Sequence, residues 1–237
     1  MKKGISAIHT LNTFDYMLYK MLNFNNVVYI PWGVDLTFLE SCKSKSKNDK
    51  FTVIFLGARY QKGADFALKI FQHLQSRVDF QVIIITGHGS LREMVNKFYK
   101  FSGSYRNVRI IDWLPRAEFL KLLSQSHALL FPSRTETFGL VVLEALGMGT
   151  PVIAFDIPGA PHDILKLEIN KGNLVGYTSS PFDIWNLAKG LILFYSIWRA
   201  DPEAYTEISR KCISVASRYP ISHMAKSLVS LFKECII

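Results

Sequence analysis

Short apolar runs alternate with longer amphipathic stretches along most of the chain. The apolar runs are rich in Val, Ile, Leu and Phe, which is typical of strands buried on both faces of a sheet. We predict strands at 27–30, 51–56, 81–86, 108–111, 128–131 and 152–155. A shorter strand at Leu174 and Val175 is predicted to follow them.

The stretches between these runs place apolar residues at helical spacing, as Ala67, Ile70 and Leu74 do in the first of them. We predict helices at 12–22, 64–76, 90–100, 116–125, 139–147, 182–198, 202–217 and 222–235. Regular alternation of strands and helices favours parallel strands joined by right-handed crossovers. The predicted fold class is therefore α/β, a Rossmann-like parallel sheet flanked by helices.

Ligands bind to sheets of this kind beyond the carboxyl ends of the strands. We expect five loops to converge there: 57–63, 87–91, 112–116, 132–139 and 156–162. The sequence Gly87-His88-Gly89 is a weak dinucleotide signal, because Arg92 occupies the third glycine position. We interpret it as a tight turn that lets the backbone approach a ligand.

The strand, loop and helix in 131–147 carry two carboxylates eight positions apart, Glu136 in the loop and Glu144 on the helix. The loop ends in Thr137, Phe138 and Gly139, whose backbone N–H groups lie at the positive end of the helix and favour an anion. Glu144 falls on a face expected to be buried, so it needs a partner such as a bound polyol. Judged by spacing alone, an ordinary structural unit with a solvated glutamate stays open as an alternative.

As a whole, 131–155 resembles the donor-site motif of family 4 retaining glycosyltransferases, P-S-x-x-E-G-F-G-L-x-x-L-E-A-x-A-x-G-x-P-V-I-A, which have the GT-B fold. The matching residues are Pro132, Ser133, Glu136, Phe138, Gly139, Leu140, Leu143, Glu144, Ala145, Gly149, Pro151, Val152, Ile153 and Ala154. Thr137 stands where the family has glycine beside the first glutamate.

Three other segments agree with this resemblance. Residues 30–35 resemble the I-P-N-G-V-D hinge, with Trp32 in place of Asn, and 107–114 resembles N-V-x-F-x-G-x-x, with Asp112 in place of Gly. Residues 51–63 resemble the strand and loop that contain G-R-x-x-x-x-K-G, although Arg59 and Lys62 are closer together than in that pattern.

The resemblance implies a role for each matching residue. Arg59 and Lys62 would contact the donor diphosphate, Glu136 would approach the donor sugar, and Glu144 would hold the ribose hydroxyls. Phe138, Gly139 and Leu140 would bind the donor through their backbone N–H groups, and Trp113 and Leu114 would border the pocket for the nucleobase. The other expected donor-binding residues are Gly57, Gly87, Ser133 and Thr137. The donor would be a UDP-sugar or a GDP-sugar, and no metal or other cofactor is expected.

GT-B enzymes have two Rossmann-like domains, and the resemblance extends from about residue 4 to 195, over the carboxy-terminal, donor-binding one. We therefore expect most of the acceptor domain to be absent. The predicted division is a short remnant at 1–29, a nucleotide-sugar-binding domain at 30–200 and carboxy-terminal helices at 201–237 that pack on it. His9 is interpreted as structural rather than as a catalytic base.

Three functions fit these features. The first is a retaining, metal-independent hexosyltransferase acting on a glycan, lipid or protein acceptor, with the acceptor side built from 1–29, a second copy or a partner chain. The second is a nucleotide-sugar-binding module that transfers nothing alone. The third is a sugar-nucleotide epimerase, which shares the architecture but normally needs both domains.

Charge adds a preference for phosphorylated or acidic partners, because 28 Lys and Arg against 19 Asp and Glu give a net charge of +9. No nucleic-acid module is recognised, so nucleic acid is not expected. We interpret the basic, Ser-rich segment 42–50 as a solvated, mobile surface loop. Three scattered cysteines fit the cytoplasm, and the aromatic residues in 182–198 leave peripheral membrane contact open.

Overall fold

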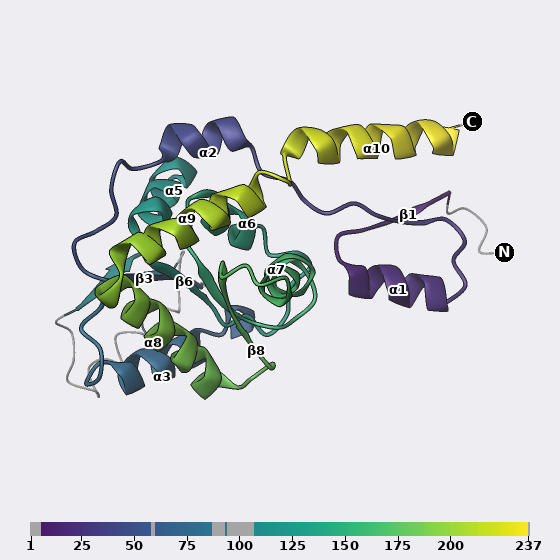
Figure 1. Cartoon of the computed structure of the whole chain (residues 1–237). Helices are drawn as coiled ribbons and strands as arrows, with labels where there is room; N and C mark the ends of the chain where they lie inside the picture. Colours follow the sequence, from purple (N-terminus) through teal and green to yellow (C-terminus); the bar gives the residue numbers. More distant parts are fainter. Residues whose placement is uncertain (1–5, 58–59, 87–92, 94–106, 237) are drawn as a thin grey trace.

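A computed structural model describes residues 6–57, 60–86, 93 and 107–236, and its main body is built on a parallel sheet (Figure 1). Within the described ranges this sheet has six strands in the order β5-β4-β3-β6-β7-β8. The strands are β3 (Thr52–Leu56), β4 (Gln81–Ile85), β5 (Val108–Ile111), β6 (Ala128–Phe131), β7 (Val152–Phe155) and β8 (Gly176–Ser179). The predicted α/β, Rossmann-like class is confirmed.

Helices cover both faces of the sheet because its strands are apolar on both sides; in β6 and β7 every residue is buried. Figure 1 shows one group of helices above the sheet and another below it. The upper group is α2 (Leu36–Cys42), α5 (Arg116–Gln125), α6 (Leu140–Gly147) and α9 (Pro202–Ala216). The lower group is α3 (Ala64–Leu74) and α8 (Ile184–Ala200).

The order of the strands fixes where loops can meet. After β3 the chain runs outward through β4 to β5, and it then returns to the other side of β3 to form β6. The strand order therefore reverses between β3 and β6, and such a switch point opens a crevice beyond the carboxyl ends of the strands. The loops that leave β3 and β6 are 57–63 and 132–139, two of those predicted to converge.

Most predicted elements agree with the observed ones to within a few residues. The last strand is an exception, because β8 begins at Gly176, after the predicted Leu174 and Val175. Three helical segments were not predicted: α2, the 3₁₀ helix η1 (Tyr60–Lys62), and the π-helix η2 (Pro161–Lys166), which runs into α7 (Leu167–Asn170). The helix predicted at 90–100 lies outside the described residues, apart from residue 93.

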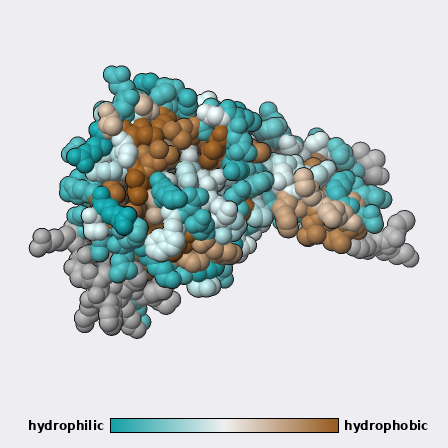
Figure 2. All heavy atoms as spheres, turned by 60° about the horizontal axis from the view of Figure 1, so that its bottom comes forward, coloured by the Kyte–Doolittle hydropathy of each residue, from teal (hydrophilic) through white to brown (hydrophobic). Residues whose placement is uncertain are grey.

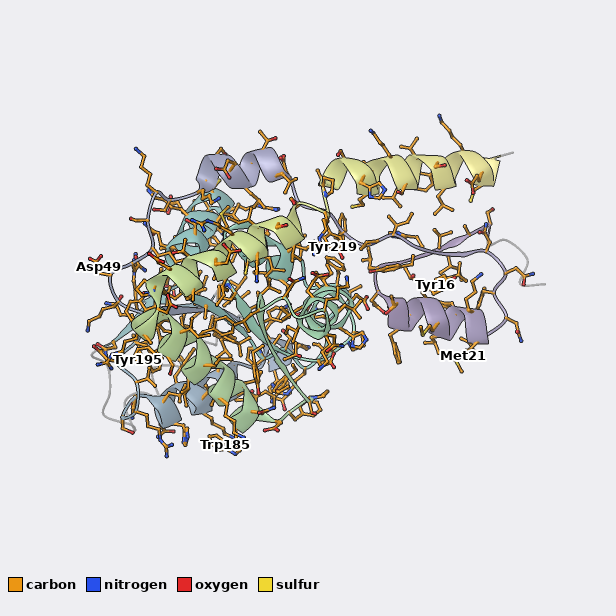
Figure 3. All side chains as sticks on the ribbon, in the orientation of Figure 1. Tyr16, Met21, Asp49, Trp185, Tyr195 and Tyr219 are labelled. Carbon is orange, nitrogen blue, oxygen red and sulfur yellow. The ribbon has the colours of Figure 1, made fainter. Side chains whose placement is uncertain are left out.

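A small unit stands beside the main body. It contains β1 (Ile8–Thr10), α1 (Thr13–Met21) and β2 (Val27–Tyr29), with the two strands parallel. Figure 1 shows α10 (Ile221–Ile236) leaving the main body and running past this unit, and Figure 3 shows Tyr219 at the junction. The ring of His9 bonds the carbonyl of Ile30 at 2.8 Å, a structural contact within this unit.

Among the described residues, hydrogen bonds join the small unit to the main body at two places. Asn12 donates from its side-chain amide to the carbonyl of Thr137 at 2.9 Å. Thr13 donates from its backbone N–H to the carboxylate of Asp163 at 2.9 Å. Asn12 also caps α1, by accepting from the N–H of Asp15. The start of α1 is therefore held against the loop that carries Glu136 and Thr137.

The interpretation of 42–50 as a solvated loop is wrong for Lys47. Its ammonium donates to the carbonyl of Ser126 at 2.6 Å, and to the carbonyl of Ser124 and the hydroxyl of Thr150 at 3.2 Å each. Burial lowers the pKa of Lys47 to about 7. The segment is thus anchored at its centre to the carboxyl end of α5, where the last carbonyls of a helix lack partners of their own.

Figure 2 shows apolar side chains at the surface of the small unit. On α1 the exposed ones include Phe14, Met17 and Met21, which is the most exposed at 80%, and Figure 3 shows Met21 near the end of the helix. No helix in the described part of the chain is both long and apolar enough to cross a membrane.

Candidate functional site

The turn that follows β3 lies directly against the loop that follows β6. Gly63, with φ at +72°, directly precedes α3, and a β-carbon there would lie 2.0 Å from the carbonyl oxygen of Pro132. A glycine is therefore needed for this approach. The N–H of Arg134 donates to the carbonyl of Gln61 at 2.7 Å and joins the two segments. This contact brings Lys62 beside Glu136.

Lys62 and Glu136 form an ion pair with 2.5 Å between Nζ and Oε1. The Glu136 side chain is 9% exposed and that of Lys62 is 36% exposed. The ammonium also lies 5.6 Å from the centre of the Phe131 ring, at the end of β6. A largely buried carboxylate is thus balanced by a cation that still reaches solvent, at the carboxyl ends of the central strands.

The amino end of α6 lies next to this pair. Gly139 directly precedes the helix with φ at +86°, a conformation that glycine adopts readily. The backbone N–H groups of Phe138, Gly139 and Leu140 form no backbone hydrogen bond within the part of the chain that the structure describes. Since these groups and the helix dipole both favour negative charge, this end of α6 suits a phosphate or a carboxylate.

Glu144 lies in the middle of α6 and is buried. Arg116, the first residue of α5, places Nη2 at 2.6 Å from Glu144 Oε1. Burial raises the pKa of Glu144, and the charge of Arg116 opposes that rise. The predicted need of this carboxylate for a partner is therefore met in part by a side chain.

A cavity of about 660 Å³ opens beside these groups. Its volume lies in the usual range of small-molecule sites, roughly 300–1,000 Å³. Its lining is apolar at the strand ends and polar at Lys62, Arg116 and Glu144. The lining residues are Leu56, Lys62, Ile85, Asp112, Trp113, Leu114, Arg116, Phe119, Leu140 and Glu144.

The structure brings together many of the predicted site residues. Lys62, Trp113, Leu114, Leu140 and Glu144 line the cavity. Glu136 does not line the cavity itself, but it accepts a hydrogen bond from Lys62, which does.

The cavity is not lined by three further predicted site residues, Gly57, Ser133 and Thr137. Ser133 is fully buried, and its hydroxyl has no hydrogen-bond partner among the described residues. Gly57 donates its N–H to Ile85 within the sheet, and Thr137 offers its carbonyl to Asn12. Arg59 and Gly87 lie outside the described residues.

Two arginines of this region were not predicted, Arg116 and Arg134. Arg134 donates to both oxygens of Asp65, at 2.9 and 2.8 Å, and its guanidinium stacks on the rings of Tyr60 and Phe66. Burial alone would raise the pKa of Asp65, but Arg134 outweighs it and the pKa is lowered. The sequence did contain a signal for Arg116. A cation at the amino end of a helix is unfavourable next to the helix dipole, so its presence there indicates an acidic partner elsewhere in the structure.

Comparison with known proteins agrees with this geometry. The family model "Glycosyl transferases group 1" matches residues 39–211. An uncharacterized glycosyltransferase of Methanocaldococcus jannaschii is 25% identical over 87% of this chain and 50% of its own length. Glycogen synthase of Mycobacterium tuberculosis is 25% identical over 68% of this chain and 38% of its own length. The chain spans about half the length, or less, of these curated relatives.

Solved structures show the same fold. A mutant of S. aureus TarM, solved in complex with fondaparinux, alpha-GlcNAc-glycerol and UDP, superposes with a TM-score of 0.79 at 19% identity. The match covers 96% of this chain and 44% of that one. The family model matches well over half of the chain, and this likeness confirms the fold as one part of a GT-B protein. The chain belongs to the group 1 glycosyltransferases.

Proposed function

We propose that this chain binds a nucleotide-sugar donor in the 660 Å³ cavity and transfers its sugar with retention of configuration. The donor is a UDP-sugar or a GDP-sugar, and the acceptor is a glycan, a lipid or a protein. One observation carries the proposal: the Lys62–Glu136 pair, Glu144 and the open N–H groups of α6 lie together at the switch point of the sheet.

The diphosphate is assigned to Lys62 and to the N–H groups of Phe138, Gly139 and Leu140. Negative charge grows on the leaving diphosphate as the glycosidic bond breaks, and fixed donors aimed at that charge stabilise it. The exposed side of the Lys62 ammonium is free to meet a phosphate while Glu136 holds the other side. Arg59 is assigned to the same phosphates, and the proposal includes no catalytic metal.

Glu136 is assigned to the donor sugar and Glu144 to the ribose. The two carboxylates serve different parts of the donor, so they are not the pair of a glycosidase, which flanks one bond. The nucleobase is assigned to the apolar end of the cavity near Leu56, Ile85 and the exposed ring of Trp113. Leu114, Ser133, Thr137, Gly57 and Gly87 complete the proposed donor site.

The second candidate is a donor-binding module that needs a partner chain for transfer. It is supported by the extent of the match, since the chain spans about half of the relatives it resembles. Under either candidate we keep the division into 1–29, 30–200 and 201–237 as a proposal.

Thermal unfolding with UDP, GDP and ADP tests the donor site. A ligand at 100 times its dissociation constant stabilises the folded state by about 2.7 kcal/mol, or roughly 5–10 °C for a chain of this size. Glu144→Ala should weaken binding by about 1–3 kcal/mol, because it removes a charged acceptor for the ribose. Glu118→Ala, which changes an exposed residue on α5, is the matched control.

Hydrolysis of UDP-glucose and GDP-mannose by the isolated chain separates the two candidates. Release of the nucleotide favours a transferase, and binding without release favours the module. Absence of a thermal shift with all three nucleotides would contradict both.

A further inference from the structure

Arg116 occupies a position that the stability of its own helix does not explain. It is the first residue of α5, directly after Pro115, where a positive charge faces the positive end of the helix dipole. Its side chain is 53% exposed, so burial does not force its conformation. The guanidinium nevertheless lies 2.6 Å from Glu144, across the cavity wall. The guanidinium also lies 6.0 Å from the centre of the Phe38 ring, and its charged partner is Glu144.

The two carboxylate oxygens of Glu144 differ in their contacts. Oε1 lies 2.6 Å from Nη2 of Arg116 in an ion pair, and Oε2 has no hydrogen-bond partner among the residues that the structure describes. The side chain is 9% exposed and lines the cavity. A carboxylate held in this way presents one open acceptor toward a ligand, and it can accept from two neighbouring hydroxyls only while it is ionised.

We propose that Arg116 is a positioning residue of the donor site, which acts through Glu144 and sets the recognition of a vicinal diol. The inference rests on the proposed function, because the diol is the ribose of the nucleotide sugar. Arg116 fixes the orientation of the carboxylate and keeps it ionised although it is buried. The ribose is uncharged and cannot replace Arg116 as the partner of Glu144, so the ion pair persists when the donor binds.

Two other charged groups face the same cavity. Lys62 reaches it from the turn before α3, and Asp112 from the end of β5. Lys62 is paired with Glu136, and Asp112 contacts the hydroxyl of Thr86 at 3.3 Å. In the described part of the chain, Arg116 is the cation that contacts Glu144 directly.

Binding of paired nucleotides tests the proposal. UDP, GDP and ADP are each compared with their 2′,3′-dideoxy analogues by titration calorimetry, on wild type, Arg116→Gln and Arg116→Lys. We expect Arg116→Gln to weaken the best nucleotide about tenfold and to leave its dideoxy analogue within about twofold. Arg116→Lys should restore most of the discrimination. Arg77→Gln, which changes an exposed arginine beyond α3, is the control.

The pH dependence gives a second readout. Burial raises the pKa of Glu144, and loss of the Arg116 charge should raise it further. As the pH is lowered, binding to Arg116→Gln should therefore weaken at a higher pH than binding to wild type or to Arg116→Lys. In Glu144→Gln this pH dependence should be lost.

The outcomes separate this inference from the proposed function. If Arg116→Gln weakens the nucleotide and its dideoxy analogue equally, the arginine contacts the base or the phosphates itself, and the inference is wrong. Tighter binding by Arg116→Gln would mean competition with the ribose, which also overturns it. If wild type binds none of the nucleotides, the proposed function fails first.

Discussion

Replacement of the half-buried Lys47 by methionine should change how the stability of the protein depends on pH. The free amine has a usual pKa of 10.5, and burial lowers the pKa of Lys47 to about 7 in the folded state. Between pH 7 and pH 9 the folded state therefore binds fewer protons than the unfolded state, and the free energy of unfolding rises with pH. A methionine of similar length has no such titration.

The expected size follows from the two pKa values. Integrated from pH 7 to pH 9, the wild type gains about 2 kcal/mol of stability from this lysine, which corresponds to roughly 4–8 °C in Tm. The window ends at pH 9 because burial raises the pKa of Cys212 to about 12 from a usual 9.0. The thiol keeps its proton longer in the folded state and so contributes with the opposite sign above pH 9.

Urea unfolding at pH 7, 8 and 9 measures the difference between wild type and Lys47→Met. The variant also leaves the carbonyl of Ser126 without the amine that donates to it, so it should be less stable than wild type at pH 9. Lys45→Met changes an exposed lysine of the same segment and is the control. A difference between wild type and Lys47→Met that stays constant across this range would show that Lys47 is not titrating there, and the reasoning would be refuted.

Three further predictions concern the site and its support. Lys62→Met should lower the rate of donor hydrolysis by about a hundredfold, because it removes a cation that stabilises the leaving group. Circular dichroism should show that the variant keeps its fold. An unchanged rate of hydrolysis would exclude this role for Lys62. Burial alone would raise the pKa of Glu168, but hydrogen bonds from Arg218 and two neighbours lower it to about 2. Its stabilisation is therefore present above about pH 4.5 and lost as the pH falls toward 2, and Glu168→Gln should cost about 2 kcal/mol in urea at pH 7 but little at pH 2. Gly159→Ala should destabilise by about 2 kcal/mol or more in the same assay, because φ is +104° and the new carbon would lie 2.5 Å from the carbonyl oxygen of Phe138.

The central strands could be predicted because they are buried on both faces, so their sequences are continuous apolar runs. The last strand, β8, was misplaced because Gly176, Tyr177, Thr178 and Ser179 form a polar edge strand without such a run. α2 was missed because it is short, although Asp35 gives a cap signal by accepting from the N–H of Phe38 at 3.0 Å.

The site could be predicted only as far as strand topology and the family resemblance reach. Topology and the resemblance placed Lys62 and Glu136 at one edge of the sheet, and the structure joins them although they are 74 positions apart. The partners of Arg116 and Arg134 could not be read from spacing, because they depend on the path of two loops. Lys47 was misinterpreted because a basic, Ser-rich segment has the same composition whether its central lysine is solvated or buried.

In the described part of the chain, three cations at this end of the sheet are each paired with an acid, and their exposure indicates which pairs a ligand can change. Arg134, at 15% exposed, holds two loops together through Asp65 and is the least able to move. Lys62, at 36%, can turn from Glu136 toward a diphosphate, since the phosphates bring the negative charge that replaces the carboxylate. Arg116 is more exposed, at 53%, but an uncharged ribose gives it no reason to leave Glu144. Donor binding should therefore rearrange the Lys62 pair and leave the other two intact.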